Sequence, residues 1–355
     1  MADSTGTTKG TNRRRFFQYA AALGVGGQTL LKSGNLNAAI ADARESVGAP
    51  WPEMQYRTLG RTGFEASRLV FGCGASLMRA NKDGLLNMAF EAGVNTFDVG
   101  TTHYYDMAER NMKNFLKAHR DEVFLISKAN PGFEDSDLMV QPGESLSVDK
   151  AKRAGKAWLK LLDLSLSELG TESVDAYYQM AANNVEMVGS EEMYKAFEQA
   201  KAAGKVKYYG LSTHQIAEDV LKKAIETEFF DLAMIAITPG GWYDWEGKDM
   251  LEGSPPMADL RPLFDEAREA GIGLIGMKAV RYFSGGFFGT SNKKAFDRYY
   301  PQDLLAAKMS AFQRSYAYVL ENGLDCVNAD IQNYDQLREN HIAAATSNQF
   351  FQNTA

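Results

Sequence analysis

Two side chains of opposite charge stand near the ends of neighbouring apolar stretches of this sequence. Asp98 lies in the stretch 95–99, and Lys128 ends the stretch 123–128. A carboxylate at the end of an apolar strand loses hydration and needs a partner, for which Lys128 is the natural choice. The pair is either a structural ion pair or part of a proton-transfer site. His103 follows shortly after Asp98, and an imidazole suits proton transfer because it titrates near neutral pH.

Histidine and cysteine give no pattern typical of a metal site. His119, His214 and His341 stand on three separate segments without ligand spacing. Cys73 and Cys326 are too few for a disulfide framework, and both lie in apolar runs. We expect no bound metal and two buried, inert thiols, while a single bridge stays open in an oxidising compartment.

Composition narrows the class of protein further. The chain of 355 residues carries a net charge of -7, with 45% hydrophobic and 23% charged residues. These values are typical of a globular protein. The basic block 150–160 indicates a solvated helix face rather than a nucleic-acid footprint, so we expect no nucleic-acid partner.

The elements that must position these residues form a repeated alternation of short apolar runs and amphipathic stretches. Several of the amphipathic stretches end at a glycine just before the next apolar run, as helix ends do. Eight such pairs predict one α/β domain, a closed (β/α)8 TIM barrel, preceded by a β-hairpin around residues 56–64. An open doubly wound sheet is the alternative, but Gly72-Cys73-Gly74 is too short for its nucleotide-binding turn. The predicted strands are 69–72, 95–99, 123–128, 174–180, 207–211, 232–237, 273–278 and 326–329.

The first residues resemble an export signal. A basic cluster precedes a Gly- and Ala-rich apolar stretch within residues 11–31, and Arg13-Arg14-Arg15-Phe16-Phe17 resembles the twin-arginine motif. An A-x-A site at residues 39–41 predicts cleavage near Asp42. We therefore expect a signal peptide over 1–41, a linker over 42–55, the barrel over 56–345 and a tail over 346–355. The expected partner is the twin-arginine export machinery, the location is periplasmic or extracytoplasmic, and no stable membrane span follows cleavage. A disordered basic arm is the alternative.

Seven segments in order resemble the aldo-keto reductases. They are the hairpin YRTLGRTGF, the ends of the second to fifth predicted strands, the block GIGLIGMKAV and the helix start NYDQLREN. The resemblance covers nearly all of the chain after the leader. It implies reversible reduction of a small carbonyl or oxidation of an alcohol, with hydride from a nicotinamide cofactor. In that family a tyrosine gives the proton, a lysine paired with an aspartate lowers the pKa of that tyrosine, and a histidine orients the carbonyl.

The resemblance matches two of the four catalytic positions, leaves the tyrosine open and finds the histidine replaced. Asp98 and Lys128 match the family aspartate and lysine. The tyrosine falls on Tyr104 when the loop is one residue longer than usual, and we favour it, with His103 and Tyr105 as open alternatives. The histidine position carries Met180, whose thioether cannot donate a hydrogen bond. Asn183 and Asn184 are the nearby side chains that could supply a donor instead.

The cofactor positions are also altered. The resemblance places Ser212 and Thr213 at the nicotinamide carboxamide, with Lys278 also in the cofactor site. It puts Glu339 and Asn340 at the adenine. Other expected contacts are replaced by Met234 on the sixth strand, by Ile237 at the stacking aromatic, and by Asp330, Ile331 and Gln336 at the 2′-phosphate site. Since an aspartate repels a phosphate, NAD(H) is favoured over NADP(H), if a dinucleotide binds.

The sequence thus favours an exported aldo-keto reductase-like oxidoreductase with an altered catalytic tetrad. Two alternatives remain: a non-catalytic barrel that binds a ligand or partner, and a lyase or isomerase that works without nicotinamide. Fold class alone does not separate them, because function depends on the site.

Overall fold

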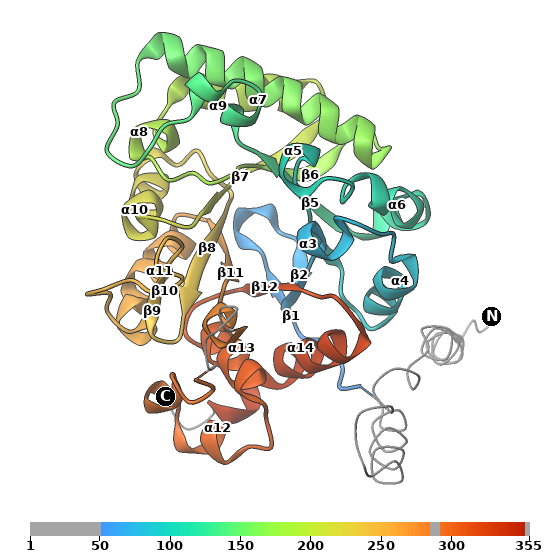
Figure 1. The fold of residues 1–355 in the computed structure, drawn as a ribbon, viewed down its shortest axis with the longest axis vertical. Coiled ribbons are helices and arrows are strands. Elements are labelled where there is room, and N and C mark those ends of the chain that lie inside the picture. The colour runs from blue at the N-terminus through green and yellow to red at the C-terminus, as the bar shows by residue number, and fades with distance from the viewer. Residues whose placement is uncertain (1–50, 285–291, 352–355) are drawn as a thin grey trace, which may run out of the picture.

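The structure is a computed structural model that describes residues 51–284 and 292–351. Eight parallel strands pair in the order β8-β11-β12-β3-β4-β5-β6-β7, and β7 pairs with β8 to close the sheet. The predicted barrel is confirmed. Figure 1 looks at the barrel with the helices arranged around it. Its strands are β3 (Leu69–Gly72), β4 (Thr96–Asp98), β5 (Phe124–Ala129), β6 (Val174–Gln179), β7 (Val206–Thr213), β8 (Leu232–Thr238), β11 (Gly273–Met277) and β12 (Cys326–Asp330).

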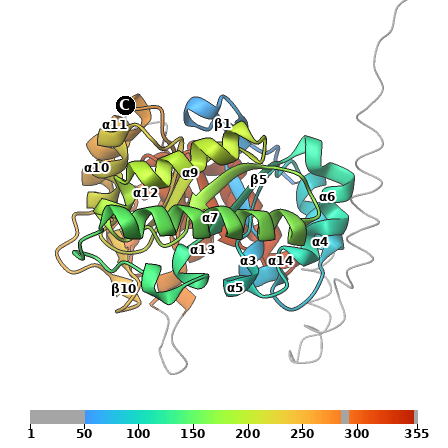
Figure 2. The same cartoon turned by 90° about the horizontal axis from the view of Figure 1, so that it is seen from above.

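Amphipathic helices cover the outside of the barrel because each buries one apolar stripe against the strands. The longest, α7, starts at Ser147, whose side chain accepts from the Lys150 amide, and it ends at Gly170 with φ 67°. Figure 2 shows α7 lying alongside α9. The main covering helices are α4 (Asp83–Glu91), α6 (Lys113–His119), α7 (Val148–Leu169), α9 (Glu191–Ala202), α10 (Ala217–Thr227), α11 (Arg261–Glu269), α13 (Ala311–Glu321) and α14 (Tyr334–Thr346).

The strands alternate between two apolar layers, as the period of a pleated strand requires. One layer lies between the sheet and the helices. The other fills the barrel lumen and includes Phe124, Ile126, Tyr178, Met234 and Met277. Because the barrel strands are parallel, their carboxyl ends lie at the same end of the barrel, called the mouth below. Polar side chains at these strand ends gather there.

A hairpin closes the other end of the barrel. The strands β1 (Tyr56–Thr58) and β2 (Glu65–Ser67) pair antiparallel, as predicted. In their turn, the Arg61 amide donates to the Gly271 carbonyl at 2.7 Å, and Leu59 joins the lumen cluster. A Cβ at Gly60 would lie 2.3 Å from the Gly273 nitrogen, so only glycine permits this close approach.

The segments predicted as linker and tail pack against the barrel where they are described. Trp51 lies 4.8 Å from the ring of His341 on α14, and Met54 is buried. After α14, η9 (Ser347–Phe350) continues the chain, and Phe351 packs on Tyr318. The predicted signal peptide lies outside the described residues. Within residues 51–284 and 292–351, no helix is long and apolar enough to cross a membrane.

An insertion after β8 lies at the mouth. The strands β9 (Gly241–Asp244) and β10 (Asp249–Met250) form an antiparallel hairpin. Tyr243 and Trp245 from this hairpin contact the lumen cluster. The sequence pattern did not predict this hairpin.

Candidate active site

Asp98 and Lys128 meet at the mouth because β4 and β5 are neighbours and each ends there. The Lys128 Nζ donates to Asp98 Oδ1 at 2.5 Å and to the Val99 carbonyl at 2.7 Å. The two side chains are 7% and 5% exposed for Asp98 and Lys128, so the charges compensate each other inside the protein. The expected pairing of these two residues is observed.

Asn328 is a third member of this group, which the sequence did not indicate. Its Nδ2 donates to the second oxygen of Asp98, Oδ2, at 2.7 Å and lies 3.3 Å from the sulfur of Met234. Gly72 allows this position, because a Cβ there would lie 2.5 Å from Asn328 Oδ1. A polar residue on a lumen-facing strand position was the available signal. Asn328 fixes the orientation of the carboxylate.

Tyr105 is the tyrosine that lies against this pair. It ends α5 (Thr102–Tyr105), and its ring centroid is 5.8 Å from Lys128 Nζ. The ring fits against two glycines: a Cβ at Gly74 or Gly100 would approach it to 2.5 Å or 3.0 Å. Burial first, then the charge of Asp98, raises the pKa of the Tyr105 phenol. The expected lowering by lysine is not found for this phenol, because burial, the largest cause, and the charge of Asp98 both raise its pKa.

Tyr104 and His103 point elsewhere. Tyr104 is 45% exposed, and its ring packs on Tyr105 and Phe133. His103 is exposed, with Nδ1 3.3 Å from the Thr101 hydroxyl. Successive residues of a helix turn by about 100°, so adjacent side chains cannot share one direction. The geometry therefore favours Tyr105 over the preferred candidate Tyr104.

Met180 is buried just beyond β6. The asparagine side chains near it make hydrogen bonds within the protein. Asn130 Nδ2 donates to the Met180 carbonyl at 2.9 Å. Asn183 Oδ1 accepts from the amides of His214 and Gln215 after β7.

The side chain of Asn184 also makes hydrogen bonds within the protein. It caps α8 (Val185–Val188), and its Nδ2 donates to the carbonyls of Gln141 and Glu144 at 2.8 Å each. The hypothesis that Asn183 or Asn184 replaces the histidine as a donor is therefore not supported by their contacts.

Ser212 is the best-placed polar group for a cofactor on β7. It is 1% exposed, lies in register with Met234, and its Oγ makes no hydrogen bond to any described residue. Thr213 differs, because its Oγ1 is 3.0 Å from Asn183 Oδ1 and 2.8 Å from the Gln215 carbonyl. A buried hydroxyl without a partner calls for a ligand or water.

The assignment of Ile237 to the stacking position is wrong. Ile237 belongs to the outer apolar layer, on the helix side of β8. Met277 on β11 occupies the lumen near the mouth instead. The error arose because strand alternation changes the face with every residue.

Lysine side chains meet an indole ring at the mouth. Lys248 Nζ and Lys278 Nζ lie 3.6 Å and 5.0 Å from the ring centroid of Trp245. Burial and the neighbouring cations, Arg281 first, lower the pKa of Lys278 to about 8. Burial and the charge of Lys278 lower the pKa of His214 to about 3, so its imidazole is neutral at pH 7.

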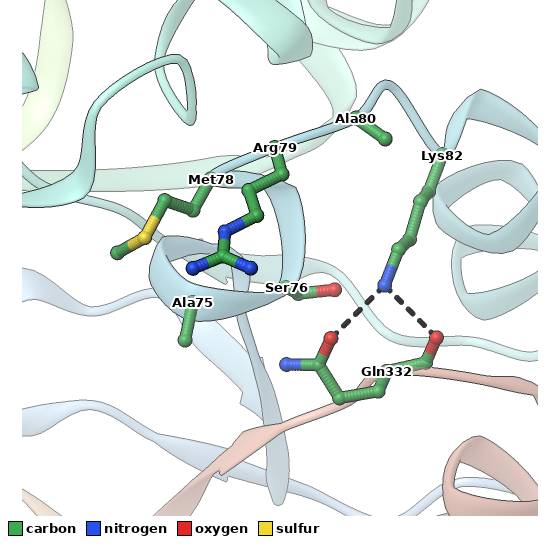
Figure 3. A pocket seen from close by; sticks show the side chains of 7 residues that line it. All are labelled: Ala75, Ser76, Met78, Arg79, Ala80, Lys82 and Gln332. Carbon is green, nitrogen blue, oxygen red and sulfur yellow. Dashed lines mark hydrogen bonds between the residues drawn. The ribbon is translucent and has the colours of Figure 1, made fainter.

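The positions expected at the adenosine lie at the end of β12. Gln332 Nε2 donates to Asp330 Oδ1 at 2.6 Å, and Lys82 Nζ donates to the Gln332 carbonyl at 2.9 Å. Figure 3 shows Lys82 reaching Gln332 across a cavity of about 350 Å³, with Arg79 also on its wall. Positive charge therefore stands close to Asp330.

The rest of that region lies along α14. Gln336 Oε1 accepts from the Gln332 amide at 2.7 Å, so its side chain supports the loop before α14. Ile331 and Asn340 are buried, and Glu339 is half-buried. Asn340 thus faces inward from α14, whereas Glu339 is accessible.

Among the described residues, the cysteines form no disulfide bond and no metal cluster. Cys73 and Cys326 are free and buried, in the outer and the lumen cluster respectively. In the described part of the chain, no three His, Cys, Asp or Glu side chains gather as metal ligands do.

A closed β/α barrel with a buried Asp–Lys pair beneath a tyrosine at its mouth is the architecture of a barrel enzyme. The sequence pattern of the Aldo/keto reductase family matches residues 71–298, and this chain belongs to that family. An uncharacterised oxidoreductase of Bacillus subtilis (strain 168) is 26% identical over 303 residues, covering 82% of this chain and 91% of the relative. A probable aldo-keto reductase of Glycine max is 27% identical over 323 residues, covering 80% and 83%.

Solved structures show the same fold. A holo-form aldo-keto reductase from Bacillus halodurans has a TM-score of 0.56 at 20% identity, covering 85% of this chain and 96% of its own. One from Klebsiella pneumoniae, in complex with NADPH, has a TM-score of 0.57 at 16% identity, covering 82% and 89%. Family membership makes this chain an oxidoreductase of the NAD(P)-dependent aldo-keto reductase type.

Proposed function

We propose that this protein reduces a small carbonyl compound reversibly, with Tyr105 as the proton donor and NAD(H) as the preferred cofactor. One observation carries the proposal: the Asp98–Lys128 pair is intact, buried, and lies against Tyr105. A structural ion pair alone does not account for a tyrosine ring held over the lysine. Tyr104 and His103 are the alternative proton donors.

The residues at the mouth fit a nicotinamide cofactor. The hydroxyl of Ser212, which has no hydrogen-bond partner among the described residues, suits the carboxamide, and the resemblance assigns Lys278 and Glu339 to further cofactor contacts. When bound, the nicotinamide supplies the hydride. Asp330 at the adenosine end disfavours an additional phosphate, which supports NAD(H).

Each residue then has a defined part in the proton step. Tyr105 keeps its proton at neutral pH, because the pKa of the phenol is raised, and it gives this proton to the carbonyl oxygen. Lys128 stabilises the phenolate that remains, and Asp98 with Asn328 holds Lys128 in place. Met180 adds no hydrogen bond to the carbonyl, so Tyr105 alone orients it among these residues.

The test is a titration of the purified protein with NADH and with NADPH, followed by tryptophan fluorescence. NADH binding with a Kd below about 100 μM, within the usual range for enzyme ligands, supports the proposal. Consumption of NADH with p-nitrobenzaldehyde as a probe carbonyl then measures turnover. Absence of binding of either dinucleotide at millimolar concentration contradicts the proposal.

A second function, a non-catalytic ligand-binding barrel, is favoured by Met180 and by the engaged Asn183 and Asn184. Without a donor from this side, carbonyl activation is weakened. NADH binding without turnover of any probe carbonyl would favour it. A nicotinamide-independent lyase or isomerase would show turnover of a carbonyl substrate with no NADH binding.

We also propose export through the twin-arginine route, on the strength of Arg13, Arg14 and the A-x-A site at 39–41. Such a route accepts folded proteins, so a bound cofactor can travel with the chain. The double variant Arg13→Lys, Arg14→Lys is expected to retain the protein in the cytoplasmic fraction. Normal export of that variant contradicts this route, and Arg57→Lys is the matched control.

A further inference from the structure

A buried carboxyl group lies close in the chain to the proposed proton donor. Glu109 follows Tyr105 by four residues, stands directly before η2 (Arg110–Met112) and is 0% exposed. A carboxyl group in such a place loses its hydration and needs hydrogen bonds in compensation. The proton step described above does not use this group.

The contacts of Glu109 come from three elements. The Ser127 hydroxyl on β5 donates to Glu109 Oε1 at 2.7 Å. Burial raises the pKa of Glu109, and hydrogen bonding to Ser127, to Ser165 on α7 and to the backbone of Thr102 lowers it in part. Thr102 is the first residue of α5, the short helix that ends with Tyr105. The carboxyl group therefore lies between α5, β5 and α7.

The partner of Glu109 is the strand neighbour of the proposed site lysine. Ser127 stands directly before Lys128 on β5, and consecutive residues of a strand point to opposite faces. Lys128 points into the barrel toward Asp98, whereas Ser127 points outward to Glu109. The Tyr105 ring centroid lies 5.8 Å from Lys128 Nζ. One strand thus carries the lysine on its inner face and the anchor of the tyrosine segment on its outer face.

The backbone between Tyr105 and Glu109 adopts a sparsely populated conformation. Asp106 has φ 49° and ψ -114°, which a residue other than glycine adopts at a cost. The Asp106 amide donates to the Thr102 carbonyl at 3.0 Å, and the Thr102 hydroxyl donates to the Asp106 carbonyl at 2.7 Å. These bonds hold the turn on the side of α5. Glu109 is the buried polar residue that holds it on the side of β5.

We propose that Glu109 is a positioning residue that keeps the ring of Tyr105 against Lys128 through its hydrogen bond with Ser127. The inference rests on the proposed function, because Glu109 acts through Tyr105. Glu109 touches neither substrate nor cofactor in this arrangement. Without the bond, α5 is free to shift relative to β5, and the phenol moves away from the place where it gives up its proton.

The experiment removes each end of the bond in the purified full-length protein with NADH and p-nitrobenzaldehyde. Glu109→Ala, Ser127→Ala and the double variant are each expected to lose about tenfold or more in kcat, because small displacements of reacting groups slow the chemical step. NADH affinity should stay unchanged, and the solvent deuterium isotope effect on kcat should rise, since proton transfer then limits the rate. The double variant should be no worse than the more impaired single variant, because all three lack the same bond.

Two further variants separate positioning from a general loss of stability. Glu109→Gln keeps an oxygen that accepts from Ser127 and should retain kcat within about threefold. Ser67→Ala removes a buried hydroxyl that donates to the Leu69 carbonyl at 2.7 Å, at the closed end of the barrel. It is the matched control for a lost buried hydroxyl, and its kcat should stay within about twofold of the parent. A loss in Glu109→Gln as large as in Glu109→Ala overturns the inference.

Amide hydrogen exchange over residues 101–112 tests the positioning without turnover. We expect faster exchange in Glu109→Ala and Ser127→Ala, but not in Ser67→Ala, because the turn opens more often without its anchor. If the parent neither binds NADH nor reduces the probe, the proposed function fails, and the exchange still decides whether Glu109 holds the turn. Exchange equal to that of the parent, or undiminished kcat in both alanine variants, overturns the inference.

Discussion

Two adjacent tyrosines on α5 have very different surroundings, and this difference can be tested. Tyr105 lies over Lys128, whereas Tyr104 is exposed. Removing the hydroxyl in Tyr105→Phe is expected to lower kcat about 100-fold or more, the usual size of a lost general acid. Tyr104→Phe is the matched control and should stay within about twofold, because its hydroxyl faces solvent.

Steady-state NADH oxidation measures both variants. A large loss in Tyr104→Phe with a silent Tyr105→Phe would restore the assignment that the sequence favoured. Loss in neither would point to His103 as the donor.

Asp330 is expected to set the cofactor preference. Asp330→Asn keeps an acceptor for Gln332 and removes the negative charge. We expect NADPH affinity to improve about tenfold relative to NADH affinity, since one charge pair near a protein surface is of this order. Fluorescence titration of both dinucleotides measures the ratio. An unchanged ratio would mean that the 2′-phosphate does not approach this residue.

At the scale of single residues, the sequence predicted the site residues whose position depends on their own strand. Asp98 and Lys128 were found because each ends an apolar strand. The choice between Tyr104 and Tyr105 depends on the length and direction of a loop, which spacing does not encode. Asn328 was missed because its partner, Asp98, lies 230 residues away in the chain.

At the scale of elements, the strands and helix ends were predictable because burial imposes periodicity. Gly93, Gly170, Gly204 and Gly271, predicted to end helices, all have positive φ. The amphipathic stretch 302–320 reads as one helix, but in the structure it is divided into α12 (Gln302–Ala306) and α13. The signal for the break was present: Ser310 and Gln313 form a capping box at the start of α13.

One buried cation joins several elements at the amino end of the barrel. Arg68, just before β3, is 2% exposed and donates to Glu321 and to the carbonyls of Leu320 and Leu324. Arg68→Met removes the ion-pair partner of Glu321, which keeps the hydroxyl of Ser347, and removes the side-chain donor to the two carbonyls. We expect the free energy of unfolding to fall by about 3–5 kcal/mol.

Urea denaturation measures this loss, and Arg57→Met, an exposed neighbour, should change the stability by less than about 0.5 kcal/mol. NADH affinity should be unchanged in the folded Arg68→Met protein, because the residue lies at the opposite end from the mouth. A stability equal to the parent would show that the buried network contributes no net stabilisation.

At the scale of the whole molecule, the residues ahead of the barrel and the last helix form one unit. His341 Nε2 donates to the Pro52 carbonyl at 2.8 Å, with the ring neutral because burial lowers its pKa. Gln55 Nε2 donates to the Ala345 carbonyl at 2.7 Å, and Met54 is 5% exposed. The segment 51–55 therefore acts as a strap across α14.

The strap constrains where the leader can be removed. Cleavage near Asp42 leaves Trp51 to Gln55 in place, whereas removal of residues 1–55 deletes the strap. A chain beginning at residue 56 is expected to be less stable than one beginning at residue 51 by about 3 kcal/mol, since the apolar surface that Met54 and part of Trp51 cover becomes exposed. Urea unfolding of the two chains measures the difference, and Glu53→Ala, an exposed strap residue, is the control within the longer chain. Equal stability of the two chains would show that the strap is a passive linker, and would free the cleavage site from this constraint.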